Sequence, residues 1–131
     1  MLVSESTTSE LDQIARSVVD SVFCVHQALG PGLLESVYQA CLCEELRSRR
    51  ISFQEQVCLP IKYRSLRLDG GLRLDLLVSD SIIVELKSVL RMEPIFKAQL
   101  LSYLRLSGLR LGFLVNFNVA LIKDGICRIV S

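Results

Sequence analysis

Residues 72–87 read LRLDLLVSDSIIVELK, which is two apolar runs joined by the polar tripeptide Ser79-Asp80-Ser81. Short runs of Leu, Ile and Val bounded by turn-forming residues are typical of neighbouring strands that are buried on both faces. A three-residue loop between them pairs Val78 with Ile82. The stretch therefore predicts a buried β-hairpin.

Charged residues inside such strands are informative, because burying a charge is costly unless it is paired or bound to a metal. The predicted register places Asp75 opposite Glu85, with Cβ atoms about 4.5–5.5 Å apart. Glu85 and Lys87 are two residues apart and project from one face. Two carboxylates this close repel unless one takes up a proton or both bind a cation. Oxygen donors without nitrogen or sulfur favour Mg²⁺, with Mn²⁺ as a substitute.

These three residues also have an alternative, purely structural explanation. Asp75, Glu85 and Lys87 could form an ion pair that only stabilises the sheet, or lie in solvent at the strand ends. A register slip of one residue would send Asp75 to the opposite face and separate the carboxylates.

The surrounding pattern predicts helices before and after this hairpin and further strands on both sides of it. Pro60 interrupts one apolar stretch, and Asp69-Gly70-Gly71 is a turn signal. The connection from Leu86 through a helix to Leu109 predicts two parallel neighbouring strands. The predicted helices cover about residues 9–29, 33–49 and 94–106, and the predicted strands cover 51–59, 61–68, 72–78, 82–86, 109–117, 119–123 and 126–130.

The second predicted helix has apolar residues at helical spacing, which directs Leu34, Val37, Cys41 and Leu42 toward the core. Together the elements predict an α/β protein of the α+β kind, in which helices flank a mixed sheet. The chain forms one domain over residues 1–131, and residues 1–8 are predicted to fray.

The composition fits one packed domain and excludes several classes. Half of the 131 residues are hydrophobic, 22% are charged and the net charge is +1, so a nucleic-acid site would have to be a local basic patch. The five cysteines have no framework spacing, and Cys41-x-Cys43 is too tight for a zinc site. We therefore expect reduced thiols and a cytoplasmic protein. Neither a signal peptide nor a membrane span is predicted.

Several motifs resemble the PD-(D/E)xK nuclease superfamily, and more narrowly the bacterial family named for a G-x-x-E-x-x-Y motif. GLLESVY at residues 32–38 matches that motif. RLDLLV at 73–78 resembles the family's central strand, and VELKSV at 84–89 resembles its E-x-K strand. AQLLSYL at 98–104 and GFLVNF at 112–117 resemble the helix and the strand that follow. The match covers about residues 10–130, with the motifs in the same order.

This resemblance implies a restriction-endonuclease-like α-β-β-β-α-β core with a metal site on the hairpin. Asp75 and Glu85 would be the metal carboxylates, Glu35 the acidic residue from the early helix, and Lys87 the superfamily's lysine. Leu74 departs from the pattern, because the superfamily's name has proline there. That position varies, so the departure does not disable the site.

The roles of five further residues, near the site or in the fold, are also predicted. We expect the backbone carbonyl of Leu86 to contribute to the metal shell and Gln99 to hydrogen-bond the water or the phosphate. Tyr103 shares a helix face with Gln99, at a spacing of four residues. Tyr38 is equally well explained as a core aromatic, and Asn116 as a turn former at the end of a strand.

The function implied is a Mg²⁺-dependent phosphodiester hydrolase that acts on DNA, with RNA not excluded. Because the domain is small, we expect a homodimer or a partner protein. The alternative is a nucleic-acid-binding or assembly module that keeps the fold without turnover. A small-molecule metal hydrolase has no substrate-pocket motif to support it. Basic residues that could contact phosphates, or could simply be solvated, are Arg47, Arg49, Arg50, Lys62, Arg64, Arg67 and Arg73.

Overall fold

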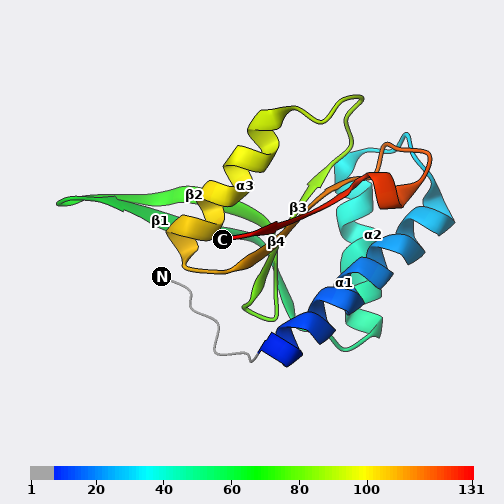
Figure 1. The fold of residues 1–131 in the computed structure, drawn as a ribbon, viewed down its shortest axis with the longest axis horizontal. Coiled ribbons are helices and arrows are strands. Elements are labelled where there is room, and N and C mark those ends of the chain that lie inside the picture. Colours follow the sequence, from blue (N-terminus) through cyan, green and yellow to red (C-terminus); the bar gives the residue numbers. More distant parts are fainter. Residues whose placement is uncertain (1–7) are drawn as a thin grey trace.

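The structure is a computed structural model that describes residues 8–131 (Figure 1). The predicted fraying of residues 1–8 falls outside this range except at Thr8, which is already helical. The elements are α1 (Thr8–Leu29), α2 (Glu35–Ser48), β1 (Phe53–Tyr63), β2 (Leu66–Val78), β3 (Ile82–Lys87), α3 (Pro94–Ser107), β4 (Leu111–Asn116), the 3-10 helix η1 (Ile122–Asp124) and β5 (Ile126–Val130).

One mixed sheet has the strand order β1-β2-β3-β4-β5. The strands β2 and β3 are antiparallel with Val78 opposite Ile82, as the sequence predicts. The strands β3 and β4 are parallel, and α3 forms the crossover between them, which confirms the second topological prediction. The predicted fold class, a mixed sheet flanked by helices, is confirmed.

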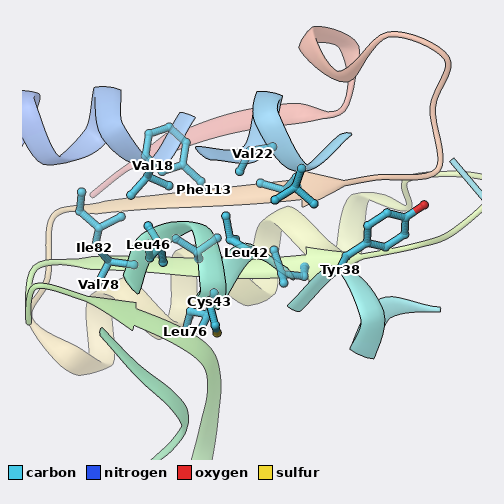
Figure 2. Close-up of a cluster of buried hydrophobic side chains, with 14 of the residues drawn as sticks. Val18, Val22, Tyr38, Leu42, Cys43, Leu46, Leu76, Val78, Ile82 and Phe113 are labelled. Carbon is cyan, nitrogen blue, oxygen red and sulfur yellow. The ribbon is translucent and has the colours of Figure 1, made fainter. Parts of the chain in front are cut away.

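Two hydrophobic clusters hold helices against opposite faces of this sheet. The larger cluster joins α1 and α2 to one face through side chains such as Val18, Leu42 and Phe113 (Figure 2). The smaller cluster joins α3 to the other face through Leu100, Leu104 and their strand partners. The three layers are therefore α1 and α2, the sheet, and α3.

The strands β1 and β2 pair far beyond the rest of the sheet and form an extended two-stranded ribbon (Figure 1). The predicted turn at residues 69–71 is wrong, because the chain reverses at Arg64, whose φ is +54°. The predicted interruption at Pro60 is also absent, because β1 continues through it with a register shift between Leu59 and Ile61. A proline fits there because a bulge needs no ladder hydrogen bond from its nitrogen.

The inward face of α2 differs from the prediction. Leu34 and Val37 are exposed, and the buried residues are Tyr38, Leu42, Cys43 and Leu46. The reason is a stacking contact in which the rings of Tyr38 and Phe117 lie 4.4 Å apart and nearly parallel. This contact fixes the rotation of the helix about its axis.

The strand predicted over residues 119–123 is also wrong. This segment forms a loop and the helix η1 instead. The ring Nε2 of His26 lies 2.8 Å from the carbonyl oxygen of Val119, a hydrogen bond that ties the loop to α1 rather than to the sheet. Across residues 8–131, none of the helices combines the length and the apolar character that crossing a bilayer requires.

Candidate metal centre and active site

The side chains of Asp75 and Glu85 meet where β2 separates from β3. The regular pairing of the two strands ends at Leu76 and Val84, one step before these residues. Beyond that point the carboxylates replace the ladder, because the Asp75 amide donates to Glu85 Oε2 at 3.0 Å. The Leu86 amide donates to Asp75 Oδ2 at 2.8 Å in return. The side chains of Asp75 and Glu85 therefore lie next to each other at the end of the β2–β3 pairing.

The Glu85 carboxyl is nearly enclosed, with 6% of the residue exposed. Burial, with the hydrogen bond to Asp75 and its negative charge as smaller causes, raises the pKa of Glu85 to about 9. The shift favours the protonated form of Glu85, whose side chain is hydrogen-bonded to that of Asp75. Two carboxyl groups that must share one proton could both ionise only if a cation replaced that proton.

Helix α3 brings two aromatic side chains to these acids. The Lys87 ammonium lies over the ring of Phe96, with Nζ 4.4 Å from the ring centroid. Burial raises the pKa of Tyr103, and the charges of Glu85 and Asp75 raise it further. This coupling means that Tyr103 lies close to both acids and keeps its phenolic proton.

Glu35, in the first turn of α2, lies near Asp75 and Lys87. Partial burial raises the pKa of Glu35, and the charge of Asp75 raises it further, whereas Lys87 lowers it. Glu35 is therefore close enough for the charges of Asp75 and Lys87 to shift its pKa. The structure thus brings together Glu35, Asp75, Glu85 and Lys87, from three elements that are separated in the sequence.

The loop before Glu35 is held in place by two hydroxyl groups. The Tyr38 hydroxyl donates to the Gly30 carbonyl at 2.5 Å and accepts from the Leu33 amide at 3.1 Å. Ser88, one residue after Lys87, donates its hydroxyl proton to the Leu33 carbonyl at 2.6 Å. These bonds fix the start of α2 against the end of β3.

The alternation of side chains along β2 breaks at Asp75. Leu74 belongs to the cluster under α3, whereas Leu76 belongs to the cluster under α1 and α2. Residues two apart on a regular strand share a face. The break coincides with the exchange of amide and carboxylate hydrogen bonds between Asp75 and Glu85.

The remaining predictions concern Gln99, Leu86 and Asn116. Gln99 is exposed, and across residues 8–131 no hydrogen bond joins it to the acids. The Leu86 amide donates to Asp75 Oδ2, and this bond restrains the backbone next to the Leu86 carbonyl, the predicted metal ligand. Asn116 is buried, and its side chain accepts from the Val89 amide and donates to the Val89 carbonyl. Its Oδ1 also accepts from the Asn118 amide at 3.1 Å, the bond of a turn-forming Asn at the end of β4, as predicted.

The residues that the sequence analysis overlooked are Phe96 and Ser88. Phe96 lies three residues before Gln99 and seven before Tyr103, a helical spacing that places all three on one side of α3. That spacing could have singled out Phe96. Ser88 follows Lys87 directly but carries no pattern of its own.

The carboxylate oxygens of Asp75 and Glu85 suit a hard divalent cation that keeps several water ligands. Across residues 8–131, no group of three or more His, Cys, Asp or Glu side chains is close enough to hold a metal ion. A cation at the Asp75–Glu85 pair would therefore take these two carboxylates and complete its shell with backbone oxygen and water. Such a shell is typical of Mg²⁺.

A family model described as the PD-(D/E)XK nuclease superfamily matches residues 12–129 of the chain. No curated protein and no solved structure matches the chain significantly. The matched region contains all the acids described above and Lys87, and it extends from α1 to β5. The chain belongs to the PD-(D/E)XK nuclease superfamily.

Proposed function

We propose that this protein is a Mg²⁺-dependent phosphodiester hydrolase that acts on DNA in preference to RNA. The observation that carries the proposal is the contact between the carboxyl groups of Asp75 and Glu85, with Lys87 beside them. Two buried carboxylates this close cannot both be ionised unless a cation neutralises them. Mn²⁺ would be an active substitute.

The residues of the site have separable roles in this proposal. Asp75, Glu85 and the Leu86 carbonyl would hold the ion. When bound, the ion supplies a Lewis acid that acidifies a water molecule and polarises a phosphate oxygen. Lys87 would donate to the phosphate as negative charge develops, from the position that its contact with Phe96 gives it.

Three residues around the ion, which are Glu35, Tyr103 and Gln99, would orient water and phosphate. Glu35 would accept a hydrogen bond from a water molecule at the ion, which fits a carboxyl group near Asp75 that does not join the inner pair. Tyr103 keeps its phenolic proton and would donate it in a hydrogen bond to a phosphate oxygen. Gln99 would approach from the same side of α3 when substrate is bound.

We also propose the narrower assignment to the G-x-x-E-x-x-Y family. Three residues of this motif have distinct roles in the loop and the helix. Gly32 adopts a φ of +96°, Glu35 approaches Asp75, and Tyr38 anchors the loop through its hydroxyl group. These roles explain why a glycine, an acid and a tyrosine are needed at this spacing.

The test is cleavage of circular and linear DNA with Mg²⁺, with Mn²⁺ and with a chelator. We expect the wild type to cleave only with a metal ion. Asp75→Asn should lower the rate at least about 10³-fold, and Lys87→Met about 10²–10³-fold. Asp80→Asn is the matched control, because Asp80 lies on the same hairpin with its carboxylate bound to Gln54, and this variant should retain full activity.

Cleavage that survives both Asp75→Asn and Lys87→Met would contradict the proposed site. A wild type that binds the metal and DNA without cleaving would support the alternative, a binding module with the same fold.

A further inference from the structure

The two-stranded ribbon formed by β1 and β2 carries an excess of positive charge. Residues 57–73, which we call the arm, contain Lys62, Arg64, Arg67 and Arg73 but only one acid, Asp69. The arm therefore has a net charge of +3, which leaves −2 for the rest of a chain whose total is +1. All four basic residues of the arm are exposed.

The pairing of the strands sorts the arm into two faces. Paired residues share a face. One face carries the pair of Lys62 with Arg67 and the pair of Cys58 with Arg73. The alternate pairs are apolar, among them Tyr63 with Leu66. The side chains of Lys62, Arg67 and Arg73 therefore lie on one face of the ribbon, and Arg64 at its tip lies over the ring of Tyr63.

The pair of Lys62 with Arg67 is unfavourable within the protein itself. Like charges directly opposite each other on neighbouring strands destabilise a sheet. Arg67 has one partner, Asp69 at 2.7 Å, and within residues 8–131 Lys62 has no ion pair. An anion supplied from outside would relieve this repulsion.

The arm begins at the candidate active site. It continues directly from Asp75, at which β2 leaves β3, and it extends away from the body (Figure 1). Across the register shift β2 has two residues more than β1, so the ribbon from Asp75 to Leu66 is as long as seven residue steps of β1, roughly 24 Å at about 3.4 Å per residue. This length is about two thirds of one turn of a DNA duplex, which is about 34–36 Å. A substrate of one or two nucleotides at the acids could not reach the tip.

We propose that the arm binds the phosphate backbone of the double-stranded DNA that the site cleaves, a role that rests on the proposed function. Its basic face contacts phosphates up to about two thirds of a helical turn from the scissile bond. A two-stranded ribbon has the dimensions to follow a groove of the duplex, and phosphate contacts fix the position of the protein without reading the sequence.

The first test measures binding to a 30-base-pair duplex in chelator, by fluorescence anisotropy at several salt concentrations. The arm variant combines Lys62→Ala, Arg64→Ala and Arg67→Ala. We expect its affinity to fall about 10- to 100-fold, and the slope of log K against log salt to decrease by about 2–3, because each lost phosphate contact removes about 0.9.

A control variant changes the net charge equally outside the arm. It combines Arg16→Ala, Arg110→Ala and Lys123→Ala, three exposed cations on the body. Its affinity should stay within about twofold of the wild type. Equal losses in both variants, or an unchanged salt slope in the arm variant, would overturn the proposal.

A single substitution separates binding from folding. Lys62→Glu places an acid opposite Arg67 and so replaces a repulsive pair with an attractive one. The urea midpoint of unfolding should stay the same or rise, while the affinity for the duplex falls. Wild-type affinity of this variant for the duplex would contradict a direct phosphate contact. A mass by light scattering that differs from that of the wild type would also contradict it, because the substitution would then act through the oligomeric state.

Cleavage assays distinguish this proposal from the proposed function. With Mn²⁺, the arm variant should cleave the duplex at least about tenfold more slowly and hydrolyse bis(p-nitrophenyl) phosphate at the wild-type rate. A wild type that cleaves neither substrate would contradict the proposed function, while the binding results would still decide the role of the arm.

Discussion

At the scale of single residues, the Glu85 carboxyl illustrates how an acid is kept inside an apolar sheet. It accepts the Asp75 amide proton and shares a hydrogen bond with the Asp75 carboxyl group. These bonds satisfy its polar atoms but do not remove the cost of ionising it. The protonation state of Glu85 should therefore be coupled to folding when no metal is present.

This coupling predicts how stability depends on pH. Because the pKa of Glu85 rises from 4.5 to about 9 on folding, its contribution to stability is complete below about pH 4.5 and is lost as the pH rises toward 9. In chelator, we expect the free energy of unfolding to fall by about 2–3 kcal/mol from pH 6 to pH 8. Urea denaturation measures this change.

Glu85→Gln should remove that part of the pH dependence, because an amide does not titrate. Glu44→Gln is a control on the exposed face of α2 and should follow the wild type. Parallel curves for the wild type and Glu85→Gln would show that Glu85 ionises normally in the folded protein.

The Tyr38 hydroxyl offers a second test at this scale. Tyr38→Phe keeps the ring stacked on Phe117 but loses the bonds to the Gly30 carbonyl and the Leu33 amide. We expect a loss of about 1–2 kcal/mol of stability and slower cleavage, because the loop before Glu35 loosens. Tyr63→Phe, at an exposed tyrosine on the arm, should change neither quantity.

At the scale of elements, the segment after β3 is fixed by the end of β4. The Asn116 side chain bonds both the amide and the carbonyl of Val89, and the Phe117 amide donates to the Lys87 carbonyl at 3.0 Å. The strand that carries Glu85 and Lys87 is thus held at its open end by its parallel neighbour. The position of Lys87 should depend on this attachment.

Asn116→Ala should therefore weaken both stability and activity. The substitution leaves the amides of Val89 and Asn118 without this partner, whereas the Val89 carbonyl keeps the Asn118 side chain, and we expect a cost of about 1–3 kcal/mol. Thermal unfolding and the cleavage rate measure the two effects. Wild-type activity in a variant of clearly lower stability would show that Lys87 is positioned without Asn116.

The hairpin that bears the acids was predictable because its pattern is local. The run of apolar residues around Asp75 and Glu85, with three polar residues between, specifies one register, and the observed pairing of Val78 with Ile82 follows it. The parallel arrangement of β3 and β4 was predictable from a general rule of handedness. Local patterns and general topology therefore sufficed for the core of the sheet.

Features that depend on contacts distant in sequence were not predictable. The rotation of α2 is fixed by the stacking of Tyr38 on Phe117, and the loop after β4 by the bond from His26 to Val119. The ribbon of β1 and β2 passes through Pro60 because the strands shift register there, which residue preferences alone do not reveal. Phe96 reaches Lys87 only through the crossover of α3.

At the scale of the whole molecule, charge is distributed unevenly. The arm is basic, whereas the site at its base gathers Glu35, Asp75 and Glu85. An acidic site repels a polyanionic substrate unless a cation neutralises it. The metal ion and the arm would therefore act together, the ion at the scissile phosphate and the arm along the backbone.

The binding of one divalent ion by the paired acids is the claim on which the function depends. Calorimetric titration with Mn²⁺ at pH 7 measures it directly, for the wild type, Asp75→Asn and Asp80→Asn. We predict that the wild type and Asp80→Asn bind about one ion per chain, and that Asp75→Asn binds it at least about tenfold more weakly. Equal binding by the wild type and Asp75→Asn, or no binding by the wild type at millimolar Mn²⁺, would contradict it.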